Sequence, residues 1–212
     1  MGREFVDLFN EWSDSYDETV SGQDIEYKKV FEQYDAILER VAQSVEGHVI
    51  EFGVGTGNLT AKLLEHGCQV TGVEPSPMMR EKAKEKVPNV QVVDGDFLNF
   101  PLNGHPVDGV VSSYAFHHLT DDEKEEAIAK YARLLEKGGK IVFADTIFLN
   151  QESKFDMIKQ AEDAHFLHLA HDLKTEYYTT IPTLEAMLEQ HDFSVDFIQM
   201  NEFVWLLYAK KQ

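Results

Sequence analysis

Three stretches of the sequence place acidic side chains at the ends of short apolar runs, where strands usually end. Glu51 stands before three alternating glycines in "HVIEFGVGTGNLTAKLLEHG", Glu74 closes "VTGVE", and Asp96 lies in "VVDGDF". Carboxylates accept hydrogen bonds from ammonium and hydroxyl groups. Glycines let a ligand come close to the backbone. This combination suits a ligand that carries positive charge and hydroxyl groups.

The glycine-rich stretch does not have the spacing of a phosphate-binding loop. Dinucleotide-binding loops need G-x-G-x-x-G, in which the third glycine lets the helix pack closely while its N-terminus faces pyrophosphate. Counted from Gly53 and Gly55, that third position is Asn58, and the third glycine is Gly57 instead. A Walker A loop is excluded because no Gly-Lys-Ser/Thr follows. A strand-to-helix turn that merely needs small residues remains the alternative interpretation.

The elements around these residues follow the pattern of a parallel sheet. Apolar runs without strict alternation, at "HVIEF", "QVTGVE", "VQVV", "DGVVSS" and "KIVFAD", alternate with helical patterns. Such runs are typical of strands buried on both faces by crossover helices. The last runs, "FSVDFIQM" and "FVWLLYAKK", are so closely joined that they must pair antiparallel. Side chains at the carboxyl ends of the parallel strands then converge on one crevice.

Residues typical of helix ends mark where the helices begin and stop. Ser76 and Pro77 have the pattern of an N-cap followed by proline at the first helical position. Thr120 opens a capping box with the glutamate three residues later. Gly67 and Gly138 stand where helix C-caps are expected.

The composition excludes several kinds of partner. The chain has 38 acidic and 19 basic residues, and its net charge of −19 repels nucleic acid and anionic membranes. The single cysteine excludes an internal disulfide and fits a reducing compartment. No run reaches the roughly 20 apolar residues of a membrane span, and the first residues carry charges where a signal peptide is apolar. We expect a cytoplasmic protein without nucleic-acid or membrane partners; the oligomeric state stays open.

Together these stretches resemble the class I S-adenosylmethionine-dependent methyltransferases, most strongly from about residue 45 to 148. The first motif of that family, acidic-x-Gly-x-Gly-x-Gly, matches residues 51–57 and lines the methionine part of the cofactor. The resemblance assigns the ribose to Glu74 and the adenine amino group to Asp96. Taken whole, the chain is also similar to the small YrrT-type methyltransferases of Gram-positive bacteria. The cofactor-binding residues that we predict are Glu51, Gly53, Gly55, Gly57, Glu74, Asp96, Phe97, Ser112 and Ser113.

The resemblance also implies the fold: an α/β, Rossmann-like sheet of seven mostly parallel strands with a C-terminal antiparallel hairpin and helices on both faces. We predict a single domain, with an N-terminal helical cap over residues 1–45 and a cofactor-binding core over 46–148. Residues 149–191 would form a helical lid and 192–212 the strand pair. The apolar rhythm of residues 27–45 predicts one amphipathic helix inside the cap.

The implied cofactor, S-adenosyl-L-methionine, agrees with the residue types, because it carries a sulfonium, an ammonium and ribose hydroxyls but no phosphate. Methyl transfer is an in-line displacement, so the protein mainly has to aim the nucleophile. A general base helps only when the acceptor is a hydroxyl or an ammonium. Our candidates for aiming or deprotonating the acceptor are Tyr16, Tyr114, His117 and His118, with Asp145 at the end of the next apolar run.

Each of these candidates also has a structural interpretation. Tyr16 resembles the N-terminal Tyr-Asp of many small-molecule methyltransferases, which helps to close the cofactor pocket, but it could equally be a packing residue. His117 and His118 could cap a loop and fill a half-buried space. Asp145 could bond to a helix N-terminus.

Three histidines, His165, His168 and His171, lie three residues apart near Asp172 and could share one helical face. Zinc favours such ligands. A polar lid surface explains them equally, and we predict no metal.

The leading hypothesis is a methyltransferase that acts on a small-molecule acceptor. The Asn/Asp-Pro-Pro-aromatic motif of enzymes that methylate adenine or glutamine amines is absent, since the corresponding run reads "SSYA" at 112–115. A protein acceptor, a non-catalytic cofactor-binding protein and a nicotinamide oxidoreductase are the alternatives. The identity and nucleophile type of the acceptor stay open.

Overall fold

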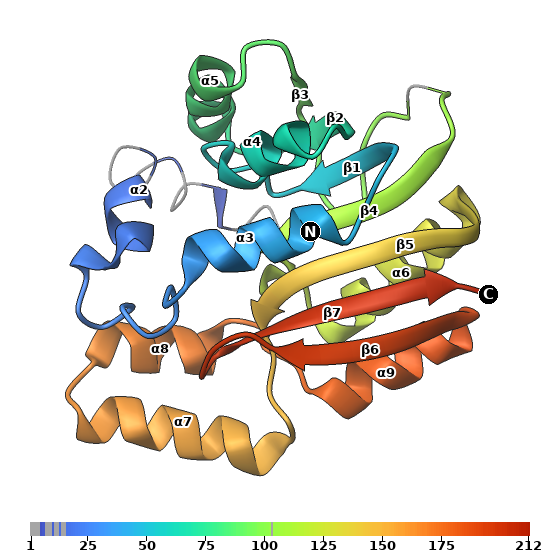
Figure 1. Cartoon of the computed structure of the whole chain (residues 1–212). Helices are drawn as coiled ribbons and strands as arrows, with labels where there is room; N and C mark the ends of the chain where they lie inside the picture. Colours follow the sequence, from blue (N-terminus) through green and yellow to red (C-terminus); the bar gives the residue numbers. More distant parts are fainter. Residues whose placement is uncertain (1–4, 7–9, 11–12, 14–15, 103) are drawn as a thin grey trace.

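The computed structural model describes residues 5, 6, 10, 13, 16–102 and 104–212 of the chain (Figure 1). In this part of the chain, one sheet of seven strands has the order β3-β2-β1-β4-β5-β7-β6. The first five strands are parallel, and β7 pairs antiparallel with β5 and β6, which confirms the predicted fold class. The strands are β1 (His48–Phe52), β2 (Gln69–Val73), β3 (Gln91–Val93), β4 (Val107–Ser113), β5 (Leu135–Thr146), β6 (Phe193–Gln199) and β7 (Val204–Lys211).

Helices cover both faces of this sheet (Figure 1). They are α2 (Tyr16–Glu18), the π-helical η1 (Thr19–Gln23), α3 (Tyr34–Gln43), α4 (Asn58–Glu65), α5 (Pro77–Lys86), the 3-10 helical η2 (Phe116–His118), α6 (Asp121–Leu134), α7 (Gln151–Asp163), α8 (Leu167–Thr175) and α9 (Ile181–Gln190). The buried side chains of α3, α4 and α8 pack with Val49 and Val111 on one face. Those of α6 and α9 pack with Ile50 and Val110 on the other. Successive strand residues point to opposite faces, so both faces need apolar side chains. Within the ranges described, no helix is long and apolar enough to span a membrane.

Three of the predicted helix ends are confirmed. The Ser76 hydroxyl accepts from the Met79 N–H at 3.1 Å, and Thr120 forms its capping box with Glu123. After α4, Gly67 has a left-handed φ of 80° and its N–H bonds to the Leu64 carbonyl oxygen. The local sequence is sufficient here because each cap involves residues only a few positions apart.

The predicted C-cap at Gly138 is wrong. Helix α6 ends at Leu134, and the chain becomes extended at once because Leu135 pairs with Val107 of β4. Gly138 has a φ of 91° inside the first part of β5. Strand pairing, which the local sequence does not reveal, therefore ends the helix earlier than its apolar pattern suggests.

The predicted helix over residues 27–45 is also wrong in its first half, because only α3 is helical there and turns precede it. Gln33 has a left-handed φ of 61°. The side-chain amide of Asn201, in the turn between β6 and β7, donates to the carbonyl oxygens of Val30 and Glu32 at 3.0 and 2.9 Å. This long-range contact occupies carbonyls that a helix would have used for its own hydrogen bonds.

The segment 149–191 is helical without a long strand, but its three helices have different positions. α7 and α8 lie beside each other beyond the end of the sheet (Figure 1). α9 instead buries Leu184 and Leu188 against the sheet and packs on β6. Only the part before α9 therefore has the position expected of a lid, and the division into cap, core and lid stays a prediction.

Candidate active site

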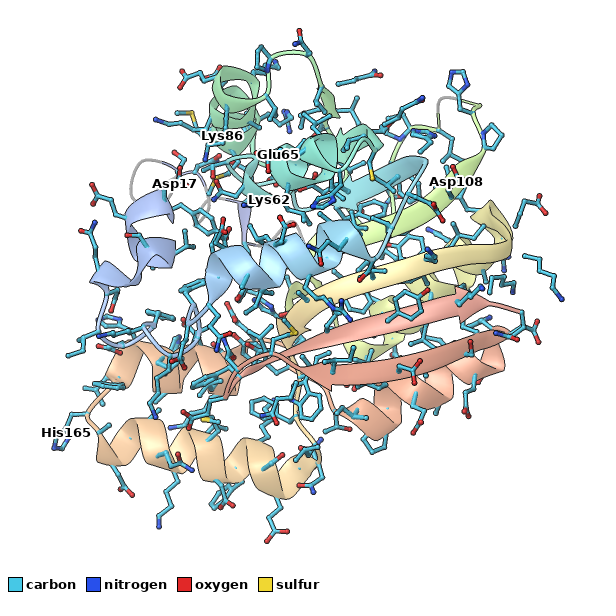
Figure 2. All side chains as sticks on the ribbon, in the orientation of Figure 1. Asp17, Lys62, Glu65, Lys86, Asp108 and His165 are labelled. Carbon is cyan, nitrogen blue, oxygen red and sulfur yellow. The ribbon has the colours of Figure 1, made fainter. Side chains whose placement is uncertain are left out.

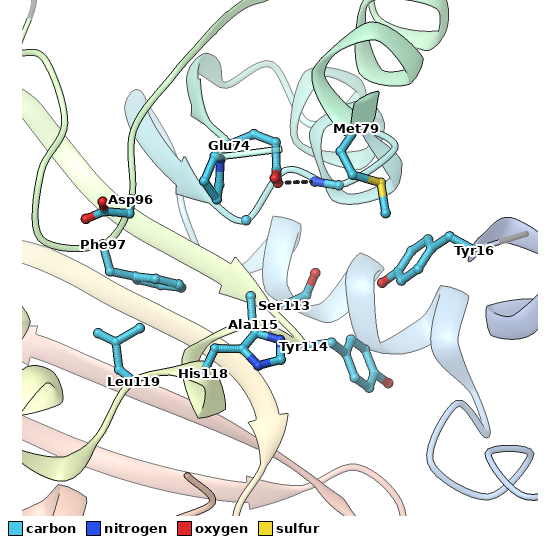
Figure 3. Close-up of a pocket in the computed structure, with 13 residues that line it drawn as sticks. Tyr16, Glu74, Met79, Asp96, Phe97, Ser113, Tyr114, Ala115, His118 and Leu119 are labelled. Carbon is cyan, nitrogen blue, oxygen red and sulfur yellow. Dashed lines mark hydrogen bonds between the residues drawn. The ribbon is translucent and has the colours of Figure 1, made fainter. Parts of the chain in front are cut away.

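A cavity opens at the carboxyl ends of the parallel strands (Figure 3). We call it the strand-end cavity. Parallel sheets collect functional groups at this edge because all their strands end there. Of the residues predicted to bind a cofactor, those that line the cavity are Gly53, Gly55, Glu74, Asp96, Phe97 and Ser113.

Gly53 and Gly55 bring the backbone to the cavity in conformations that other residues avoid. Their φ angles are 67° and 55°. A Cβ at position 53 would come within 2.7 Å of the Ala115 Cβ, whereas a Cβ at position 55 would meet no atom within 4 Å. Packing thus requires the first glycine, and the second leaves open space beside the cavity that a side chain would fill.

Two backbone N–H groups, one from the glycine loop and one from the residues after β2, hold the Glu74 carboxylate at the cavity. One carboxylate oxygen accepts from the Gly55 N–H at 2.9 Å, the bond drawn in Figure 3, and the other from the Ser76 N–H at 2.9 Å. Burial raises the pKa of Glu74, while these two backbone bonds oppose the rise. Each carboxylate oxygen keeps a further lone pair for a ligand hydroxyl.

Asp96 is fixed in a similar way in the turn after β3. Its Oδ1 accepts from the backbone N–H groups of Leu98 and Asn99 at 2.9 and 2.8 Å. The neighbouring Phe97 ring stacks on Phe52 with the ring centres 5.2 Å apart. Both side chains are thereby pre-positioned at the cavity wall.

Glu51 is placed behind the glycine loop and is not part of the cavity lining. Its carboxyl group is 1% exposed and accepts from the Thr60 hydroxyl at 2.6 Å, which ties β1 to the first turns of α4. Burial raises the pKa of Glu51 to about 8, so the group is mostly neutral at pH 7. Direct contact of Glu51 with a cofactor stays a prediction.

Ser112 and Gly57 are also set back from the cavity. The Ser112 hydroxyl is buried and donates to the Phe52 carbonyl oxygen at 2.9 Å, so its neighbour Ser113 is the one that faces the cavity. Gly57 is the N-cap of α4, with a φ of 90°. These residues shape the loop rather than line the space.

A second cavity lies beside the first, and we call it the α8 cavity. Tyr16, Tyr114 and His118 line both cavities, so the two spaces adjoin at these side chains, which we call the junction. The other walls come from the segment between residues 27 and 31, from α8 and from the loop after it. The described residues that line it are Tyr16, Tyr27, Val30, Phe31, Tyr114, His117, His118, Thr146, Leu169, Asp172, Leu173, Glu176, Tyr178 and Phe203.

His117 lies between two carboxylates in the α8 cavity. Its Nδ1 is 2.6 Å from Asp145 Oδ1, and its Nε2 is 3.4 Å from Glu176 Oε2. Its ring stacks on Tyr178, whose hydroxyl donates to Glu176 at 2.6 Å. Burial alone would lower the pKa of His117, but Asp145 and Glu176 raise it. Burial raises the pKa of Glu176. His117 and Glu176 together can therefore hold a proton near neutral pH.

The three residues shared by the cavities are neutral. Burial, with the neighbouring His117 adding to it, holds the pKa of His118 well below its usual range. Burial likewise raises the pKa values of Tyr16 and Tyr114. The Tyr114 hydroxyl is buried with no hydrogen-bond partner, and the residue has a left-handed φ of 52°. An orphaned buried hydroxyl is costly unless a ligand meets it.

The three histidines that could have shared a helical face are not grouped as metal ligands among the described residues. His165 precedes α8 with a φ of 59° (Figure 2), and the side chains of His165, His168 and His171 are all exposed. In the part of the chain that the structure describes, one group of histidine and acidic side chains could hold a metal ion. Its members, His117, His118 and Glu176, have ligand atoms within 4.8 Å of one another.

A cluster around Asp17 ties the N-terminal segment to the strand-end cavity. Asp17 Oδ1 accepts from the Thr56 hydroxyl at 2.7 Å and from the Asn58 amide at 3.1 Å, and Oδ2 pairs with Lys86 at 2.9 Å (Figure 2). Burial would raise the pKa of Asp17, but these bonds lower it. Because Tyr16 immediately precedes Asp17, the cluster also holds Tyr16 at the junction of the cavities.

Comparison with known proteins decides the family. A family model described as "Methyltransferase domain" matches residues 49–139. A protein of Anoxybacillus flavithermus described as an "Uncharacterized methyltransferase" is 58% identical over 212 residues, which cover 100% of both chains. A second, from a Geobacillus species, is 56% identical over 213 residues and also matches along 100% of both chains. The chain belongs to this methyltransferase family.

Solved structures share the fold of this methyltransferase. The magnesium protoporphyrin IX methyltransferase of Synechocystis, with bound S-adenosylhomocysteine, aligns with a TM-score of 0.72 at 15% identity over 98% of both chains. A Thermotoga maritima protein, described as a possible histamine N-methyltransferase, aligns with a TM-score of 0.68 at 19% identity over 98% of this chain and 99% of that one. At such identities the likeness concerns the fold alone.

Sequence reasoning missed several residues of the methyltransferase's α8 cavity. Glu176 and Tyr27 were not predicted as site residues, and Asp172 was considered only beside the exposed histidines. None lies in a motif, and each reaches the cavity through tertiary packing. Asp145 had a signal, because it ends an apolar run next to the strand that precedes His117.

Proposed function

We propose that this methyltransferase binds S-adenosyl-L-methionine in the strand-end cavity and transfers its methyl group to a small-molecule acceptor in the α8 cavity. The observation that carries the proposal is the junction of the two cavities at Tyr16, Tyr114 and His118. A donor and an acceptor bound in adjoining spaces can meet in line, and such positioning supplies about 7–11 kcal/mol in well-oriented reactions.

The strand-end cavity fits the chemistry of this cofactor. Glu74 offers carboxylate lone pairs to ribose hydroxyls, and Asp96 can accept from an adenine amino group. Gly55 leaves open space at the backbone, and the absence of phosphate-binding spacing agrees with a ligand that has no phosphate. The Synechocystis relative in fold holds S-adenosylhomocysteine, which supports the same ligand here.

The acceptor side fits a small molecule. The α8 cavity is lined mainly by aromatic and aliphatic side chains with a few polar groups, which is typical of small-ligand sites. When bound, the cofactor supplies a methyl group activated by its sulfonium. The chain then has to orient the acceptor, exclude water and hold any released proton. His117, oriented by Asp145, and the adjacent Glu176 are the groups positioned to hold that proton.

The test is transfer of a labelled methyl group. The purified protein is incubated with methyl-labelled cofactor and a bacterial small-metabolite extract, and labelled small products are expected. Binding of S-adenosylhomocysteine is measured in parallel by calorimetry, with NAD as the comparison. Tight S-adenosylhomocysteine binding without any transfer would show a non-catalytic binding protein. Binding of NAD but not of S-adenosylhomocysteine would overturn the cofactor assignment.

A further inference from the structure

The charged residues that line the α8 cavity favour negative over positive charge. Two carboxylates, Asp172 and Glu176, belong to it, and no Lys or Arg is among the described residues that line it. Several aromatic rings surround the same space. Building on the proposed function, we propose that the acceptor is a protonated amine and that its nitrogen receives the methyl group.

Each of the two carboxylates accepts a hydrogen bond from a phenol, and Glu176 also lies 3.4 Å from His117 Nε2. The Tyr27 hydroxyl donates to Asp172, and the Tyr178 hydroxyl donates to Glu176. A phenol orients a carboxylate without cancelling its charge. Among the described residues of the lining, His117 is the one basic side chain near Glu176 whose pKa is raised. Its Nδ1 already lies 2.6 Å from Asp145 Oδ1.

Two lysines lie close to this region but are directed elsewhere. Lys124 donates to the carbonyl oxygens of Leu119 and Tyr177, and Lys154 donates to the carbonyl oxygen of Tyr178. Neither belongs to the lining. The described residues of the lining therefore carry excess negative charge, which favours a cationic ligand and disfavours an anionic one.

Aromatic faces add to this preference. The rings of Tyr16, Tyr27, Phe31, Tyr114 and Tyr178 line the cavity. The face of an aromatic ring attracts a cation, and the attraction grows when the cation is desolvated. A neutral alcohol of the same shape would gain little from these rings or from the carboxylates.

The junction provides an acceptor for an ammonium N–H. The Tyr114 hydroxyl is buried without a hydrogen-bond partner, and Tyr114 is one of the residues that line both cavities. Its oxygen can accept one ammonium N–H. An ammonium held by Tyr114 and Glu176 would thus have its nitrogen next to the place where the methyl group is delivered.

The reaction balances with the groups present. The ammonium gives one proton to a Glu176 carboxylate oxygen, which leaves a lone pair on the nitrogen. That lone pair forms the new N–C bond while the S–C bond of the cofactor breaks, and the bond electrons stay on sulfur. The positive charge moves from the sulfonium to the methylated nitrogen, into the cavity that contains Asp172. Charge stabilisation that grows along the reaction lowers the barrier.

The experiment separates acceptors by charge. A bacterial metabolite extract is divided by ion exchange at pH 7 into cationic, neutral and anionic fractions, and each is incubated with protein and ¹³C-methyl cofactor. We expect label in the cationic fraction as an N-methyl group, identified by NMR. Label that appears only in the other fractions, or as O-methyl or S-methyl, overturns the amine proposal alone. Failure of transfer in every fraction, with S-adenosylhomocysteine binding intact, overturns the proposed function, and the amine proposal falls with it.

Charge-removing variants then test the lining with the acceptor found. Asp172→Asn and Glu176→Gln keep the shape of the side chains, and each should raise the KM for the cationic acceptor about 10-fold or more through loss of a charge-assisted contact. Glu176→Gln should also lower kcat, because it removes the group that takes the proton, whereas Asp172→Asn should change mainly KM. Affinity for S-adenosylhomocysteine should not change. Asp163→Asn, at the exposed end of α7, is the matched control. If the cavity variants change KM no more than this control does, the carboxylates do not recognise the acceptor.

Discussion

The two cavities of this methyltransferase are built in different ways. In the strand-end cavity, the key carboxylates are held by backbone N–H groups: Glu74 by Gly55 and Ser76, and Asp96 by two residues of its own turn. Backbone donors at strand ends depend on the sheet and on local turns. A ligand site of this kind is fixed as soon as the core of the domain forms.

In the α8 cavity, ionisable side chains are held by other side chains. His117 faces Asp145, and Glu176 accepts from Tyr178, which stacks on His117. Asp172 bonds to Tyr27 from the N-terminal segment. Such a site can change its chemistry by substitution without disturbing the sheet. The proposed cofactor site is therefore fixed by the backbone, whereas the proposed acceptor site is built from side chains that substitution can change.

The largest effect should come from a side chain placed on the glycine loop. Gly55→Val should weaken S-adenosylhomocysteine binding at least about 100-fold, because valine fills the open space and avoids a φ of 55°. Calorimetry measures the affinity. Gly104→Val is the control, since it has a φ of 72° and open space but lies outside the lining of either cavity. Wild-type affinity in Gly55→Val would mean that the loop is only a turn.

The next effect concerns Glu51, whose raised pKa makes stability depend on pH. The folded state keeps the proton up to a pKa of about 8, whereas the unfolded state loses it near 4.5. This contribution to stability is complete below pH 4.5 and falls by about 1.4 kcal/mol per pH unit as the pH rises towards 8. In Glu51→Gln the free energy of unfolding of the ligand-free protein should lack that slope.

Denaturant titrations at several pH values between 5 and 8 measure this difference. Glu65→Gln, an exposed change at the end of the same helix α4, should leave the slope as in the wild type (Figure 2). Identical slopes in Glu51→Gln and the wild type would show that Glu51 is ionised in the folded protein.

A third variant compares the two cavities directly. Glu74→Gln should weaken S-adenosylhomocysteine binding by about 1–3 kcal/mol, because it removes a charged acceptor and turns an amide NH₂ towards a backbone N–H. Glu176→Gln should leave this affinity unchanged. Calorimetry on both variants tests whether S-adenosylhomocysteine depends on Glu74 and not on Glu176. Equal losses of affinity in the two variants would contradict this prediction.

The smallest effect should come from the cluster that holds the N-terminal segment. Asp17→Asn weakens a half-exposed ion pair with Lys86, and such pairs contribute about 0.2–1 kcal/mol. S-adenosylhomocysteine should dissociate about 1.4- to 5-fold faster in stopped-flow measurements. Asp35→Asn, which removes an exposed partner of Lys62, is the control. Dissociation at the control's rate would mean that the cluster does not retain the ligand.

The two cavities also differ in how far they could be predicted from the sequence. The glycine loop and the acidic residues at strand ends repeat at fixed spacing because sheet geometry imposes it, so their convergence was predictable. Glu176 carries no such signal, since it is one of 38 acidic residues and stands in a loop. The same limit explains the errors at residues 27–33 and at Gly138, where contacts with distant strands decide the local structure. The cytoplasmic location and the exclusion of nucleic-acid and membrane partners stay predictions from composition.

A crystal structure with S-adenosylhomocysteine tests the central claim most directly, because that claim is that the two cavities meet at the reacting atom. We expect the ribose hydroxyls on Glu74, the adenine near Asp96 and Phe97, and the sulfur beside Tyr16, Tyr114 or His118, facing the α8 cavity. A sulfur atom directed away from that cavity, with no open path to it, would contradict the account.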